Sequence, residues 1–214
     1  MYLKPLFEET EIERLHELAK AHPLATFVTL MESEIVVNHM PVLISADGGK
    51  YGTLRGHIPR ENPLWRALDG TGEAVTVFQG PEAYISPSWY PSKRVHGKVV
   101  PTWNYVVVHA RGMPTAVDDA DWIRNHLNEL TDEHESREPQ PWSVSDAPKE
   151  FVDQMIGHVV GIEMPIASIV GKWKLSQNRP VEDQHGVVAG LRARGDEASL
   201  EIGRLIADRL NQTR

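Results

Sequence analysis

The stretch LATFVTLMESEIVVNHMPVLISADGGKYGTLRGH, residues 24–57, decides the fold class of this chain. Residues 24–30 and 34–44 are rich in Val, Ile, Leu and Thr, which predicts two antiparallel strands joined by the short link MES. A Gly-bearing turn at 47–49 leads into a third strand over 50–57. Strands at short intervals with tight turns favour a barrel or sandwich over a doubly wound sheet, in which a long helix follows each strand. We therefore expect a small closed barrel.

Helices and further strands are expected along the rest of the chain. Thr10 and Glu13 fit a capping box that starts a helix ending before Pro23, and Asn62 followed by Pro63 starts a short one. We predict strands over 73–79, 83–86, 102–111 and 158–175, and further helices over 118–133, 148–156, 182–194 and 197–210. The whole predicts a mainly β protein with flanking helices, an α+β fold. We expect one domain over 1–214, with a helical segment from about 180 to the end.

Composition and charge narrow the classes of function. The 214 residues are 41% hydrophobic, which suffices for a real core, and the formal net charge of -8 argues against a broad nucleic-acid footprint. The absence of Cys excludes disulfides, thiolate nucleophiles and Cys-ligated metals. The N-terminus lacks the apolar run of a signal peptide, and no apolar stretch of about 18 residues occurs. We expect a cytoplasmic protein without a membrane segment.

Motifs for metal or acyl-transfer chemistry are missing. The ten His show no HExxH or HxH spacing, and there is no GxSxG elbow, so neither a metal site nor a catalytic residue is predicted. The two terminal helices, 182–194 and 197–210, could suggest a helix-turn-helix. They carry acidic residues throughout, and two Gly lie in the first, which disfavours DNA reading by this pair.

An aromatic stretch, PEAYISPSWYPSKRVHGKVVPTWNY at 81–105, holds two of the six Trp and three of the five Tyr. Aromatic faces beside Ser, Thr, Asn and Lys suit a ligand with a planar ring and hydrogen-bonding edges. Trp103 could pack on such a ring while Asn104 donates to a ring carbonyl. The alternative is that the stretch forms a structural aromatic corner and that Asn104 only bridges two strands.

Two polar segments could bind a phosphate or a carbonyl-rich ligand. In GTLRGHIPREN, Arg55, His57 and Arg60 surround Gly56 just before a helix start, which is a fair phosphate cradle. The alternative is a solvent-facing turn whose Arg residues pair with nearby acids. The second segment, GKWKLSQNR at 171–179, places Lys172, Lys174 and Arg179 beside Ser176, Gln177 and Asn178. Such a density of donors favours a ligand over a hydrated turn.

The chain resembles the PaiB family, described as FMN-binding negative transcriptional regulators. Five ordered blocks carry the resemblance: VNHMPVLI at 37–44, GTLRGHIPRENPLW at 52–65, AYISPSWYPSK at 83–93, VPTWNYVVVHARG at 100–112 and KWKLSQNRPVEDQHGVVAGL at 172–191. The resemblance implies a split β-barrel of the FMN-binding type, normally a homodimer with FMN in a cleft between subunits. The insert RVHGK at 94–98 departs from the pattern and leaves the rim of that cleft undefined.

The resemblance also implies roles for individual residues. The phosphate would be held in the block that contains Leu54, Arg55, Gly56, His57 and Arg60. The isoalloxazine would lie near His39 and Met40, with Trp103 and Asn104 close by. Further donors, from the partner subunit, would be Lys174, Ser176, Gln177 and Asn178. The acidic charge does not itself predict the operator binding that the regulator label suggests. The alternatives are an FMN-dependent oxidoreductase, with a nicotinamide as electron donor, and a haem-binding split barrel.

Overall fold

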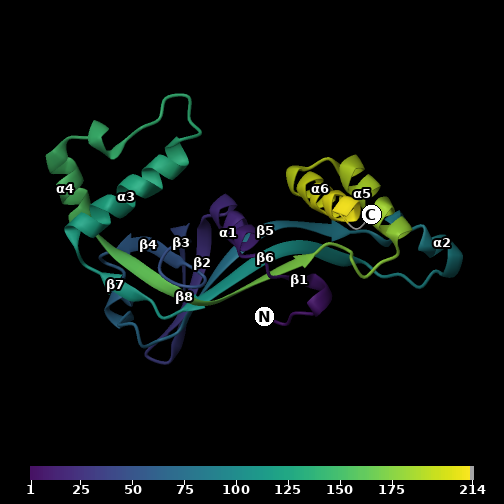
Figure 1. Ribbon diagram of the computed structural model, residues 1–214, viewed down its shortest axis with the longest axis horizontal. Coiled ribbons are helices and arrows are strands. Elements are labelled where there is room, and N and C mark those ends of the chain that lie inside the picture. The colour runs from purple at the N-terminus through teal and green to yellow at the C-terminus, as the bar shows by residue number, and fades with distance from the viewer. Residues whose placement is uncertain (213–214) are drawn as a thin grey trace. The chain divides into compact units, whose positions relative to one another are not determined.

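A computed structural model of the chain describes residues 1–212 (Figure 1). Hydrogen bonding orders its strands β1-β8-β4-β3-β2-β5-β6, while β8 also pairs with β6 and β7 pairs with β8. The strands are β1 (Glu8–Glu9), β2 (Leu24–Met31), β3 (Glu34–Ser45), β4 (Thr53–Pro59), β5 (Ala74–Ile85), β6 (Thr102–Gly112), β7 (Thr115–Val117) and β8 (Val159–Lys174). Because β8 pairs with both β4 and β6, the strand order closes on itself, which confirms the barrel expected from residues 24–57.

Helices flank the strands, as the sequence predicts. The α-helices are α1 (Ile12–Ala21), α2 (Ser92–His96), α3 (Ala120–Glu135), α4 (Lys149–Gly157), α5 (Val181–Arg194) and α6 (Glu197–Gln212). Short 3-10 turns are η1 (Pro5–Phe7), η2 (Pro63–Ala67), η3 (Pro87–Trp89) and η4 (Val144–Asp146). The Asn62 side chain accepts a hydrogen bond from the Leu64 N–H, so it caps η2 as predicted. None of the helices in residues 1–212 has the length and apolar character needed to cross a membrane.

The elements of the structure differ from the predicted ones in several places. The two strands predicted over 73–79 and 83–86 are one strand, β5, because Gly80 packs tightly there instead of ending the strand. A Cβ at Gly80 would lie 2.8 Å from the Leu18 side chain. Neither β7 nor the short helix α2 was expected from the sequence. By contrast, the strand predicted over 158–175 is confirmed: β8 is 16 residues long, and Pro165 lies within it.

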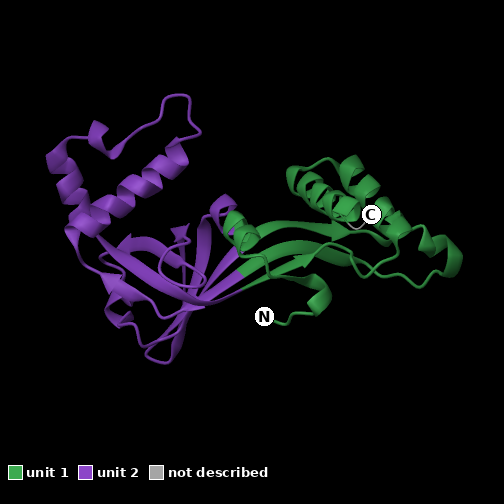
Figure 2. Ribbon diagram, viewed as in Figure 1, with its two compact units in different colours: residues 1–18, 79–108, 170–214 green, residues 19–78, 109–169 purple. Residues whose placement is uncertain are grey.

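Contacts between Cα atoms divide the chain into two compact units (Figure 2). Unit 1 comprises residues 1–18, 79–108 and 170–214, and its described part ends at residue 212. Unit 2 comprises residues 19–78 and 109–169. The strands β5, β6 and β8 each contribute residues to both units. A single domain over 1–214 stays a prediction, since this division is based on contacts alone.

In unit 2, the strands β2, β3 and β4 alternate between buried and exposed side chains. Phe27, Met40 and Leu54 lie in its core. Met40 packs against Gly56, where a Cβ would lie 3.2 Å from the Pro41 carbonyl oxygen. A second apolar cluster joins α3 to α4 through Ile123 and neighbouring aliphatic side chains.

In unit 1, the helices α5 and α6 pack on residues of β5 and β6. Val106, Leu191 and Ile202 belong to one buried cluster. Trp89, from the aromatic stretch, lies against Gly190 of α5, where an added Cβ would clash with the indole ring. Tyr90 is also buried. Part of the aromatic stretch therefore forms the structural corner that was the alternative to a ligand site.

Candidate functional site

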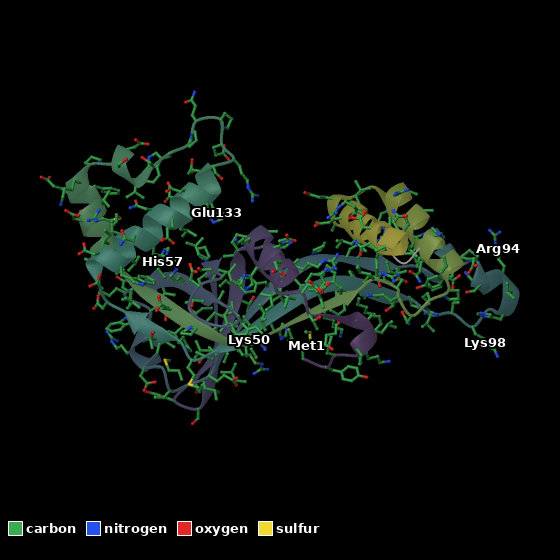
Figure 3. All side chains as sticks on the ribbon, in the orientation of Figure 1. Met1, Lys50, His57, Arg94, Lys98 and Glu133 are labelled. Atoms are coloured by element: carbon green, nitrogen blue, oxygen red, sulfur yellow. The ribbon has the colours of Figure 1, made fainter. Side chains whose placement is uncertain are left out.

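The basic residues of β4 lie on the face of the strand that α3 covers. Arg55 and His57 point to this face, while Leu54 and Gly56 are buried on the opposite one, because side chains alternate along a strand. Figure 3 shows His57 beside α3. The structure thus brings Arg55 and His57 together, but it places Leu54 and Gly56 in the core, away from any ligand on that face.

Both arginines of the predicted phosphate cradle are bound to carboxylates. Arg55 pairs with Glu129 of α3 at 2.6 Å. Arg60 pairs with Asp118 at 2.5 Å and also donates to the backbone carbonyls of Gly157 and Val159. The hydrogen bonds to Arg60 are the largest cause that holds the pKa of Asp118 below its usual value. Paired arginines were the alternative to a cradle, although the acids come from distant segments and not from the same turn.

His57 contacts a second buried histidine that no sequence motif indicated. Its Nδ1 atom lies 3.1 Å from Nε2 of His126, and the His126 ring stacks on Trp122. Burial lowers the pKa of His57, and burial, followed by the charges of His57 and Arg55, lowers that of His126 to about 4. Both imidazoles are therefore neutral at pH 7, which makes His57 a poor partner for a phosphate dianion.

His39 and Met40, expected near the isoalloxazine, lie on opposite faces of β3. Met40 is buried, whereas His39 is exposed on the same face as Ile35 and Val37. Within unit 2 only His39 of this pair is accessible from outside the core.

Trp103 and Asn104 also point to opposite faces, here of β6. The Trp103 side chain is 52% exposed and contacts Tyr84 edge to face, with the ring centroids 5.9 Å apart. Asn104 is fully buried and its Nδ2 donates to Ser176 Oγ at 2.8 Å. A ligand on the Trp103 face therefore cannot also contact Asn104, and Asn104 joins β6 to the turn after β8.

A polar cavity of unit 1 has a volume of about 440 Å³. Its cationic side chains are Lys4, Lys172, Lys174 and Arg179, and Thr102, Tyr105, Ser176 and Asn178 add polar groups to its wall. Leu6, Phe7, Val100 and Pro101 supply apolar surface. Among the described residues that line this cavity, none carries a carboxylate. Cations, hydrogen-bonding groups and an aromatic face in one cavity are the features that a phosphorylated ring compound requires.

The two lysines of β8 lie near the same aromatic ring. Their Nζ atoms are 5.2 Å (Lys172) and 5.8 Å (Lys174) from the centroid of Tyr105. Lys174 donates to Thr102 Oγ1 and to the Trp103 carbonyl, and Lys172 donates to the Tyr2 carbonyl. Burial, followed by the charges of Lys172 and Arg179, lowers the pKa of Lys174.

The other predicted donors of the 171–179 segment have mixed roles. Gln177 accepts from the Leu175 N–H and donates to the Trp173 carbonyl, so its amide is used within its own turn. Ser176 is buried, has a left-handed φ of 63° and accepts from Asn104. Asn178 is exposed and lines the cavity. The segment thus contributes Lys174, Ser176 and Asn178 to the cavity wall.

The N-terminal side of this cavity was not predicted from the sequence. Tyr2, Lys4 and Phe7 line it because β1 pairs with β8, placing Glu8 opposite Lys172. No local pattern in residues 1–9 indicates that pairing, since β1 has only two residues.

A groove of about 450 Å³ lies in unit 2, beside the end of α3. Lys20 and Arg55 line it together with Glu129, Asp132, Glu133 and His134. Its charges are mixed, and Arg55 already pairs with Glu129. The groove is therefore a less favourable binding site for an anion than the cavity of unit 1.

The strand order and the flanking helices define the chain as a split β-barrel, and solved structures share this fold. A FAD and heme binding protein from Mycobacterium smegmatis matches with a TM-score of 0.56 and 16% identity, over 88% of this chain and 80% of that one. The conserved hypothetical protein Rv2991 from Mycobacterium tuberculosis matches with a TM-score of 0.57 and 12% identity, over 84% and 94%. Both likenesses concern the fold.

The chain belongs to the family described as "Putative FMN-binding domain", whose model matches residues 1–168. It is 30% identical to protein AN0679 of Emericella nidulans, over 98% of this chain and 97% of that one. It is 26% identical to the Protease synthase and sporulation protein PAI 2 of Bacillus subtilis, over 99% of both chains. The resemblance to the PaiB family is thereby confirmed.

Proposed function

We propose that this protein binds FMN as a homodimer. The observation that carries the proposal is the cavity of unit 1, in which cationic side chains face an aromatic ring in a chain of the FMN-binding family. Flavin chemistry requires few protein acids or bases, because the cofactor carries the reaction and the protein binds and orients it. Lys174, Ser176 and Asn178 would hold the flavin there, and Tyr105 would offer it a flat surface.

An apolar face of unit 2 supports the homodimer. Leu30 lies opposite Ile35, and Val28 lies opposite Val37, on the outer side of the β2–β3 hairpin. Leu30, Ile35 and Val37 are 63%, 73% and 52% exposed. Contiguous exposed aliphatic side chains of this kind mark protein interfaces, and a second copy with the same face forms an isologous contact about a two-fold axis.

The regulator role is proposed from the PaiB relationship alone. We infer that it does not depend on DNA reading by α5 and α6. The apolar side of α6, with Ile202 and Ile206, packs in the core of unit 1, and both helices begin with acidic residues. Any promoter binding by this protein should therefore be weak, or mediated by another molecule. Salt-sensitive binding to one promoter fragment over competing DNA would contradict this inference.

A titration tests flavin binding directly. Purified protein, freed of flavin, is titrated with FMN while flavin fluorescence and the visible absorption band are followed. We expect saturable binding of one FMN per protomer, with a change in fluorescence. Parallel titrations with FAD and haem show whether another cofactor is preferred, the haem arm being read from its Soret band. An absence of saturable FMN binding would refute the proposal.

A further inference from the structure

The cavity of unit 1 carries positive charge that its own walls leave uncompensated. Lys172 and Lys174 are two residues apart on β8, so they project to the same side, and Arg179 follows in the next turn. The ion pairs found among residues 1–212 include none of these three cations. Glu8 lies opposite Lys172 in the β1–β8 ladder, but its side chain is exposed and does not line the cavity.

We infer that this cavity binds the flavin phosphate, and that the β4 group, which consists of Arg55, His57 and the following Arg60, does not. The ligand class is a flavin with a 5′-phosphate, as in FMN or in the diphosphate of FAD. This inference rests on the proposed flavin binding and adds which residues hold the anion: Lys172, Lys174 and Arg179. An anion placed among like charges relieves their mutual repulsion and accepts charge-assisted hydrogen bonds.

The donors needed for a phosphate remain free at these cations. An ammonium group has three N–H donors. Lys174 uses two of them, on Thr102 Oγ1 and the Trp103 carbonyl, and Lys172 uses one, on the Tyr2 carbonyl. The Arg179 guanidinium lies over the Tyr90 ring, with Cζ 4.8 Å from the ring centroid, and this contact with a neutral ring leaves its charge without a carboxylate partner. The internal contacts therefore position the cations without neutralising them.

The β4 group shows the opposite arrangement. Arg55 and Arg60 both end on carboxylates, and the His57 ring faces His126. A phosphate at β4 would have to displace Glu129 or Asp118, or lie close to them, and like-charge contact opposes that. The two arginines of the β4 group are thus already paired, whereas Lys172, Lys174 and Arg179 of the unit 1 cavity are in none of the ion pairs found among residues 1–212.

The test compares FMN with riboflavin, which has the same ring system and lacks the phosphate. For each variant the ratio of the two dissociation constants measures the phosphate contribution alone. We expect Arg179→Gln and Lys172→Gln each to lower the preference for FMN about tenfold, with riboflavin affinity unchanged. Retained riboflavin binding also shows that the variant is folded. An FAD arm distinguishes a monoester site from one that takes a diphosphate.

Two variants serve as matched comparisons. Arg194 stacks on Trp89, with its guanidinium 4.6 Å from the ring centroid, but it does not line the cavity, so Arg194→Gln should keep the full preference for FMN. Arg60→Gln tests the β4 cradle, and this variant should also keep the full preference for FMN. If Arg60→Gln abolishes the preference while Arg179→Gln and Lys172→Gln retain it, the inference is wrong and flavin binding stands. If the unmodified protein binds neither flavin, the proposed function fails and the inference with it.

Discussion

The Nδ1 atom of His57 and the Nε2 atom of His126 lie 3.1 Å apart between β4 and α3, and burial lowers the pKa of both imidazoles. A hydrogen bond between neutral rings joins the helix to the barrel strand there. After burial, the charges of His57 and then of Arg55, which pairs with Glu129, further lower the pKa of His126. The contact between β4 and α3 at these two histidines therefore depends on pH.

The first prediction follows from this pair. In the unfolded chain both His titrate near the ordinary histidine pKa of 6.5, whereas in the folded protein the pKa of His126 is about 4. Stability is therefore full above about pH 6.5 and is lost as the pH falls toward 4, because the unfolded state takes up the proton first. We expect the free energy of unfolding to fall by roughly 1–2 kcal/mol between pH 7 and pH 5, measured by urea unfolding. His126→Leu should flatten this dependence, and His134→Gln, at an exposed position of α3, should not. An equally steep curve for His126→Leu would contradict the assignment.

A second prediction concerns Arg60, which ties Asp118 to the carbonyls of Gly157 and Val159. Arg60→Ala should lower the melting temperature, since two backbone acceptors and a carboxylate lose their donor. Asp118→Asn is the matched change, and it should cost less because the carbonyl contacts remain. Thermal unfolding by circular dichroism measures both. A melting temperature unchanged in Arg60→Ala would show that these contacts are not formed in solution.

A third prediction tests the packing of the aromatic stretch on α5. A Cβ at Gly190 would overlap the Trp89 ring. Gly190→Ala should therefore destabilise the protein by about 1–3 kcal/mol, although Ala favours helix formation. Gly72→Ala is the control, because no atom lies within 4 Å of an added Cβ there. Chemical unfolding should separate the two, and equal stability of Gly190→Ala and the parent would rule out this packing.

A fourth prediction concerns the buried bond from Asn104 Nδ2 to Ser176 Oγ, which is 2.8 Å long. Ser176→Ala leaves a buried amide without its acceptor and should cost about 1–3 kcal/mol of unfolding free energy. Ser176→Gly loses the same bond but suits the left-handed φ of 63° at this position, so it should cost less. The measurement compares the unfolding free energies of the two variants. Greater stability of the Ala variant would mean that backbone conformation does not matter at this turn.

A fifth prediction tests the apolar face of the β2–β3 hairpin. Ile35 and Val37 are both exposed on it, so Ile35→Lys and Val37→Lys should each convert a homodimer to monomers. Sedimentation velocity gives the mass of the particle. Val95→Lys is a control at an equally exposed aliphatic side chain outside this face. Dimers that persist in both hairpin variants would place the interface elsewhere.

Much of the fold was predictable because it depends on local patterns. The Val, Ile, Leu and Thr of residues 24–44 predicted β2 and β3, the Gly-bearing turn at 47–49 led to the prediction of β4, and the cap at Asn62 begins η2 as expected. The candidate site was predictable only as separate segments. Neighbouring residues such as Trp103 and Asn104 were expected to act together, yet alternation along β6 sends them to opposite faces.

By itself the sequence determined most of the strands and helices, the family and the segments rich in donors, since each depends on patterns among residues close together in the chain. Only the tertiary structure decided which charges are neutralised. Arg60 meets Asp118 across 58 positions, and Arg55 meets Glu129 across 74. The physical reason is that ion pairing depends on which strands and helices become neighbours, and closure of the barrel sets those neighbours.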